Sequence, residues 1–169
     1  MKTTKTIILS FIMAAIFGIS TEAQNPTLNK SVNTLITNYL ALKDALIAAD
    51  GNTAESKAKA LLASINEVPK SDFNSQQLAL WTKYEAKLQY DSRHISEVNL
   101  VAHQREHFAN LSNNLYEVLK GLKLNAKPLY RQYCLMKKQY FLSDGTGGKD
   151  PYMGMEHCSN VKETLPAAR

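Results

Sequence analysis

Hydrophobic residues recur at helical spacing through the first two thirds of the chain. The pattern predicts four amphipathic helices, over residues 31–49, after Thr53, over 73–95 and over 99–121. Thr53 and Asn99 are residue types that cap helix N-termini, so we expect them to begin the second and fourth helices. The breaks between the helices are short, which favours antiparallel neighbours. The sequence therefore predicts a mainly α fold, an antiparallel helical bundle of about four helices.

The helical period ends after Lys127-Pro128, where aromatic and β-branched residues begin to alternate with polar ones. Short strands are predicted over residues 129–133, 139–142 and 161–164, and the glycine-rich stretch 143–148 is typical of a turn. A segment of this length is too short to bury a stable core alone. We therefore predict a helical bundle over residues 24–127 and a small irregular and β-containing C-terminal cap over 128–169. The cap would pack on the bundle and carry both cysteines.

The first 23 residues resemble a secretion signal rather than part of the fold. Lys2 and Lys5 give a basic start, residues 7–19 are apolar, and Ala23 provides a small residue at a cleavage position. The apolar run is short for a transmembrane helix. We predict that residues 1–23 are a signal peptide cleaved near Ala23, and that the product is periplasmic or secreted without membrane insertion after cleavage.

Charge and motif content argue against two classes of function. The chain carries a net charge of +5 at pH 7, spread without a run of five like charges, so we expect no nucleic-acid partner. A catalytic cysteine would need a placed base, and His157 is the nearest candidate to Cys158. Neighbouring residues in a strand point to opposite faces, so this pair is a poor dyad. We expect that the protein is not an enzyme.

All sulfur-containing residues that follow the leader lie between positions 134 and 158. Polarisable sulfur donors suit Cu(I), and imidazole is an acceptable copper ligand. Cys134 and Met136 would share one side of an extended segment. From the other end of the cap the set would be completed by His157, Cys158 and either Met153 or Met155. The alternative is a Cys134–Cys158 disulfide, which an oxidising compartment favours and which would stabilise the cap by roughly 3 kcal/mol.

Two histidines on the fourth predicted helix are a second candidate. His103 and His107 are four residues apart, so they share a helix face and can chelate a metal ion. The opposing interpretation is one boundary histidine and one solvated histidine. His107 borders the apolar stripe, so it would reach the cap if the cap docks there. His94, at the end of the third helix, is a further imidazole of the same kind.

Several short motifs resemble one known family. In the cap these are Tyr133-Cys134-x-Met136, Leu142-Ser143, Asp150-Pro151-Tyr152-x-Gly154, Cys158 and Val161-x-Glu163-Thr164; on the fourth helix, residues 104–112 resemble a QRxxFxxLS segment. Together they are similar to the domain of unknown function 3347. The resemblance implies an exported protein and a link to heavy-metal efflux systems, whose periplasmic adaptors carry the same domain. It also implies that Cys134, Met136 and Cys158 are the family's sulfur positions, while Asp150 stands where the family has asparagine.

With the resemblance included, metal binding is our leading hypothesis. We predict an exported protein that binds a soft metal ion such as Cu(I), with an efflux-system protein as partner. The predicted ligands are drawn from Cys134, Met136, Met153, Met155, His157, Cys158 and His107. The alternative is a disulfide-stapled periplasmic interaction module that binds no metal.

Overall fold

A computed structural model describes residues 25–168 and confirms the predicted fold class. Its helices are α1 (Pro26–Ile47), α2 (Gly51–Asn66), α3 (Ser75–Ser96) and α4 (Val101–Leu122), with a short 3-10 helix at Lys70–Asp72. Three strands follow: β1 (Leu129–Cys134), β2 (Gln139–Ser143) and β3 (Ser159–Leu165). Both cysteines lie in this C-terminal part. The predicted signal peptide lies outside the described residues.

The helix ends differ from the predicted ones because other residues provide the caps. Helix α1 begins at Pro26, and the side chain of Asn25 accepts a hydrogen bond from the Thr27 N–H. Helix α2 is capped by Asp50 rather than by Thr53, whose backbone N–H donates to the Asp50 carboxylate. Helix α4 begins after Leu100, which makes no side-chain cap bond. The predicted cap, Asn99, instead donates its amide to Asn52 at 3.2 Å.

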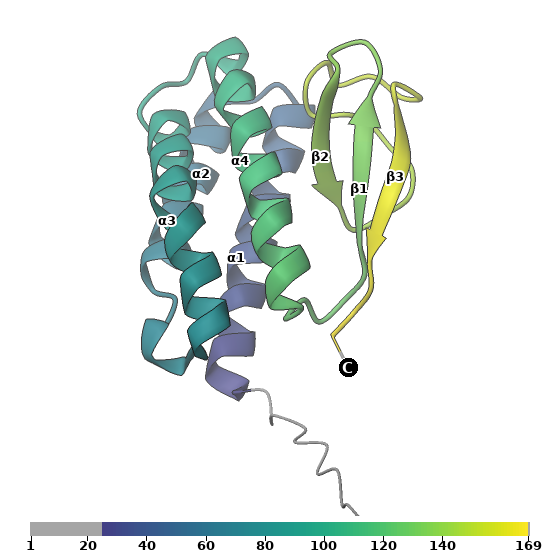
Figure 1. Cartoon of the computed structure of the whole chain (residues 1–169). Helices are drawn as coiled ribbons and strands as arrows, with labels where there is room; N and C mark the ends of the chain where they lie inside the picture. Colours follow the sequence, from purple (N-terminus) through teal and green to yellow (C-terminus); the bar gives the residue numbers. More distant parts are fainter. Residues whose placement is uncertain (1–24, 169) are drawn as a thin grey trace, which may run out of the picture.

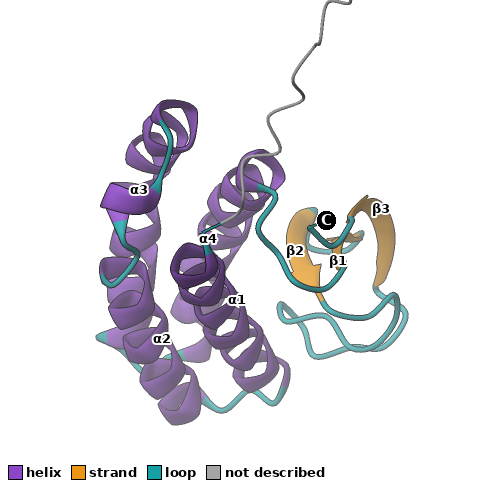
Figure 2. Cartoon of the chain, turned by 90° about the horizontal axis from the view of Figure 1, so that it is seen from below, coloured by secondary structure: helices purple, strands orange, loops and turns teal. Residues whose placement is uncertain are grey.

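The four helices form an up-and-down bundle, and the sheet stands beside it (Figure 1). Seen from below, α1 and α4 lie between the α2–α3 pair and the sheet (Figure 2). The largest core side chain is Trp81 of α3, which is fully buried and packs against Phe73 with ring centroids 5.7 Å apart. Within the described residues, no helix is long and apolar enough to cross a lipid bilayer.

The cap is an antiparallel sheet with the order β2-β1-β3. Strands β1 and β2 form a hairpin joined by a turn at residues 135–138, where Lys138 adopts a positive φ of 54°. A longer loop, residues 144–158, then returns along the length of the sheet to the start of β3, because β2 and β3 both run antiparallel to β1. In the register between β1 and β3, Cys134 lies opposite Ser159. The end of β1 is therefore where the two cysteines meet.

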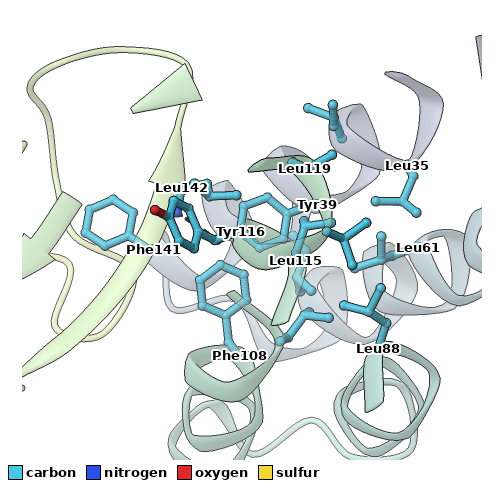
Figure 3. Packing of buried hydrophobic residues seen from close by; sticks show 14 of the residues in the cluster. Leu35, Tyr39, Leu61, Leu88, Phe108, Leu115, Tyr116, Leu119, Phe141 and Leu142 are labelled. Atoms are coloured by element: carbon cyan, nitrogen blue, oxygen red, sulfur yellow. Dashed lines mark hydrogen bonds between the residues drawn. The ribbon is translucent and has the colours of Figure 1, made fainter. Parts of the chain in front are cut away.

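The cap packs against the bundle through aromatic rings and one buried hydroxyl. Phe108 of α4 stacks on Tyr39 of α1 at 5.1 Å and also faces Tyr152 of the cap at 6.1 Å. The Tyr39 hydroxyl accepts a hydrogen bond from the Leu142 N–H at 3.0 Å, so it joins α1 to β2. Figure 3 shows Tyr39 and Phe108 beside Phe141 and Leu142. Among the cap aromatics, Phe141 and Tyr152 are buried, whereas three tyrosines are only half-buried: Tyr130, Tyr133 and Tyr140.

Candidate metal centre

Three potential metal ligands gather at the end of the cap sheet. They are the thiols of Cys134 and Cys158 and the carboxylate of Asp150, and one ligand atom from each lies within 4.8 Å of the other two. Cys134 and Asp150 have no exposed surface, and Cys158 is 6% exposed. Among the described residues, this is the one group of three or more His, Cys, Asp or Glu side chains that is this closely spaced. Two buried thiols beside a buried carboxylate form a compact donor set for a cation.

Strand pairing brings the cysteines together. Cys134 is the last residue of β1, and Cys158 directly precedes β3. The backbone N–H of Leu135 donates to the Cys158 carbonyl at 3.0 Å, which ties the two chain segments just beyond the regular ladder. Both cysteines are free thiols. The sheet therefore places two unbonded sulfur atoms near each other.

Asp150 is held by the loop that it organises. One carboxylate oxygen accepts the N–H groups of Tyr152 and Met153, both at 2.9 Å, and the other accepts the Met155 N–H at 3.2 Å. The Gly154 N–H donates to the Asp150 carbonyl at 2.9 Å and closes the same turn. A carboxylate oxygen has two lone pairs. The first oxygen is thus fully used by the loop, and the second keeps one lone pair for another partner.

The surroundings keep the cysteine proton in place. Burial raises the pKa of Cys134 to about 11, helped by the hydrogen bond with Cys158 and by the negative charge of Asp150. A backbone N–H from Lys137 opposes this shift. A balancing cation is Arg105 of α4, whose guanidinium donates to the Leu46 carbonyl at 2.8 Å and is attracted to Asp150. Because a metal ion needs a thiolate, binding at Cys134 has to displace this proton.

The other predicted ligands differ from this buried group in their exposure. Strand β1 ends at Cys134, so the alternation argument does not extend to Met136, which lies in the turn and is 61% exposed. Met155 is 43% exposed, and Met153 is half-buried against the core. His157 is exposed, has a positive φ of 60°, and is not in the Cys–Asp–Cys group.

His107 would reach the cap only if the cap docked on its side of α4, and its ring packs against α3 instead. Its Nδ1 lies 3.0 Å from a carboxylate oxygen of Asp91 on α3. The cap instead meets the α4 face that bears Arg105 and Ala109, which line a pocket with Tyr152. His107 is two residues from each of them, or about 200° around the helix. The apolar stripe of α4 is wide enough to contact both α3 and the cap. His107 lies at the edge of the stripe that faces α3.

Gly154 gives a test of how the loop is seated. Its φ is +68°, and a Cβ there would lie 2.9 Å from the Ile47 carbonyl oxygen at the end of α1. Gly154→Ala should therefore reduce the free energy of unfolding by about 1–3 kcal/mol, because it adds both backbone strain and a backbone clash. Urea unfolding measures this change. The matched control is Gly147→Ala, where an added Cβ meets nothing within 4 Å. Equal stability of the two variants would contradict the described seating of the loop.

Asp150 is the site residue that the sequence interpretation missed as a ligand. Asp150 is not at a sequence spacing from either cysteine that is typical of metal ligands. It lies beside them only because the 144–158 loop folds back onto the end of β1. The available signal was local: an acid before Pro151 in a glycine-rich loop is typical of a side chain that accepts its own loop's N–H groups.

The helix-four motif has structural roles in the bundle. Gln104 is fully buried, and its amide donates to the carbonyls of Gly51 and Val98 at 2.9 and 2.7 Å. Phe108 stacks on Tyr39, and Ser112 hydrogen-bonds to the Tyr39 hydroxyl at 2.7 Å. The motif thus ties α4 to the start of α2, to the α3–α4 connection and to the centre of α1.

Comparison with known proteins gives a match to the family described as "Protein of unknown function (DUF3347)", over residues 35–127. No curated protein and no solved structure matches the chain. The matched residues run from α1 to the connection before β1, which is more than half of the chain. They include the helix-four motif, whereas the cap motifs lie beyond them. The resemblance found in the sequence is thereby confirmed, and the chain belongs to the DUF3347 family.

Proposed function

We propose that this protein is an exported, non-enzymatic metal-binding protein that holds one Cu(I) ion between Cys134 and Cys158. The observation that supports the proposal best is the close group of two buried free thiols and a buried carboxylate at the end of the sheet. The helical bundle serves as the scaffold for the cap. The cap in turn shields the bound ion from water and from exchange with other thiols.

The donor set favours Cu(I) over other metal ions. A metal ion bonded to both sulfurs at about 2.3 Å, the zinc–thiolate distance, holds them no more than about 4.6 Å apart, and the ligand atoms of this group all lie within 4.8 Å of one another. A structural Zn²⁺ site takes four ligands in a tetrahedron. Here two thiols are joined by one carboxylate whose oxygens already accept three N–H groups. Two thiolates without a full tetrahedron suit a soft monovalent ion best.

Export and an efflux partner are the parts of the proposal that come from sequence. The leader pattern of residues 1–23 supports export. The family resemblance supports a role in heavy-metal handling, with an efflux-system protein as the partner that receives or delivers the ion. Cu(I) held by two buried thiolates would leave by thiol exchange with such a partner, which calls for local opening of the 144–158 loop.

The redox state of the cysteines provides the direct test. Reduced protein without the leader should bind one Cu(I) per chain in competition with a colorimetric Cu(I) chelator. The same protein blocked at both thiols with iodoacetamide should bind none, because alkylation removes both anionic donors. Binding by the blocked protein would contradict the site.

The same titration separates the alternative. Formation of a disulfide needs the sulfur atoms to approach to about 2.05 Å, and these two thiols are neighbours. If the Cys134–Cys158 pair stays oxidised in mild reductant and the purified protein binds no Cu(I), the disulfide-stapled interaction module is the correct function class. The copper proposal is then wrong.

A further inference from the structure

Three of the four histidines lie together on the outer face of α3 and α4. The rings of His94 and His107 are stacked with centroids 4.7 Å apart, and the ring of His103 lies 4.8 Å from that of His107. His94 comes from the end of α3, while His103 and His107 are one helical turn apart on α4. The fourth histidine, His157, lies in the cap.

Two of these imidazoles have one nitrogen committed to an oxygen acceptor. The Nδ1 of His94 lies 2.9 Å from the Tyr90 carbonyl oxygen, which can only accept, so this nitrogen carries the proton. The Nδ1 of His107 lies 3.0 Å from the Asp91 carboxylate, whose side chain is 5% exposed. In both rings Nε2 is then the atom with the free lone pair. Histidines that bind metals are held by the same second-nitrogen hydrogen bonds to carbonyls and carboxylates.

From this arrangement we infer that His94, His103 and His107 form a second metal site, for a divalent borderline ion, with Asp91 as the positioning carboxylate. Imidazole suits Cu²⁺, Zn²⁺ and Ni²⁺, and the Irving–Williams order makes Cu²⁺ the tightest of the three. His94 and His107 each have one ring nitrogen held by a hydrogen bond. The nitrogens of the three rings do not all lie within 4.8 Å of one another, so the rings have to turn to close around an ion. His103 is the mobile ligand, because its side chain is 41% exposed and its nearest carboxylate, Glu106, is 3.8 Å away. It completes the site by turning toward the other two rings.

This site is separate from the cysteine centre. Arg105 and Ala109, two of the α4 residues that line a pocket with the cap, lie about 200° around the helix from His107. The ligands also differ in chemistry, since imidazole nitrogen selects divalent ions and thiolate selects Cu(I). The inference therefore does not rest on the proposed function. One chain would hold a soft ion in the cap and a borderline ion on the bundle.

The test uses a chain without cysteine, so that it reports on the histidines alone. The variant Cys134→Ser/Cys158→Ser should bind one Cu²⁺, with nitrogen hyperfine structure in its EPR spectrum. In this background His107→Ala and His94→Ala should each weaken binding by about 100-fold or more, because each removes one hydrogen-bonded ligand. His103→Ala should weaken it by about 10-fold. The control His157→Ala removes an exposed histidine of the cap and should leave the affinity unchanged.

The positioning role of Asp91 is tested by the Cu²⁺ affinity of a variant at that residue. Asp91→Asn keeps an oxygen acceptor for His107 but removes the charge, and outer-shell changes of this kind cost about 10- to 100-fold in metal affinity. Circular dichroism verifies that each variant is folded. The inference would be overturned if the cysteine-free chain gave no nitrogen-coordinated Cu²⁺ signal, or if His157→Ala reduced binding as much as His107→Ala. Neither result changes what the Cu(I) titration of the wild-type protein shows. The histidine site and the cysteine site can therefore be disproved independently.

Discussion

Replacing Cys134 or Cys158 with serine should abolish tight Cu(I) binding by the reduced protein. We expect each substitution to lower the association constant by a factor on the order of 10³ or more, since changes even outside the ligand shell cost about 10- to 100-fold. Each serine removes one of the two anionic sulfur donors at the end of the sheet, and its hydroxyl stays protonated. Competition titration with a Cu(I) chelator measures the loss.

Two matched variants show whether the loss is specific to these sulfurs. Met136→Leu removes a thioether that is 61% exposed in the β1–β2 turn, so the affinity should change by less than about threefold. Asp150→Asn keeps one oxygen for the Tyr152 and Met153 N–H groups, and the affinity should fall by no more than about tenfold. A loss for Asp150→Asn as large as that for Cys134→Ser would make the carboxylate a full ligand and would favour a divalent ion.

The pH dependence of the same titration follows from the raised pKa of Cys134. Because this pKa is about 11, the thiol is protonated at neutral pH, and Cu(I) has to displace the proton. Below pH 11, the Cys134 proton alone should make the apparent affinity rise about tenfold for each unit of increasing pH. An affinity that is independent of pH between 6 and 8 would contradict the placement of the ion at this thiol.

The fold was accessible from the sequence because its helices are amphipathic over many turns. Only the ends were placed wrongly, and for local reasons. Between Pro26 and Lys30, Leu28 is the one buried residue, and a single apolar position gives no period that would predict a helix there. The N-cap of α2 was misplaced because Asp50 and Thr53 are both good caps and they bind each other, with Thr53 donating to Asp50.

The candidate site was only partly accessible. The sulfur pair follows from composition, whereas the pairing of β1 with β3 that brings the two cysteines together was not predicted. Asp150 joins them through the closure of a loop, which no periodicity encodes. The position of His107 depends on the rotation of α4 about its own axis. Its stripe packs against α3 on one side and the cap on the other, and spacing alone does not distinguish the two.

The cap and the bundle should unfold as one cooperative unit, because Phe108 is part of both cores. Its ring stacks on Tyr39 of the bundle and faces Tyr152 of the cap. Phe108→Ala should reduce the free energy of unfolding by about 3–5 kcal/mol, the usual cost of removing a buried aromatic ring. Leu100→Ala, at a position 64% exposed, is the control and should change it by less than about 0.5 kcal/mol.

Two natural probes report on the two parts during urea unfolding. Trp81 is the single tryptophan and is fully buried in α3, so its emission follows the bundle. Cys134 is fully buried in the cap, so pulse alkylation of its thiol in a Cys158→Ser chain follows the cap. We expect both probes to give one midpoint, and Phe108→Ala to shift them together. If Cys134 became reactive at a lower urea concentration than that at which Trp81 emission changes, the cap would be a separate unit that opens on its own. Its ion would then be released without unfolding of the bundle.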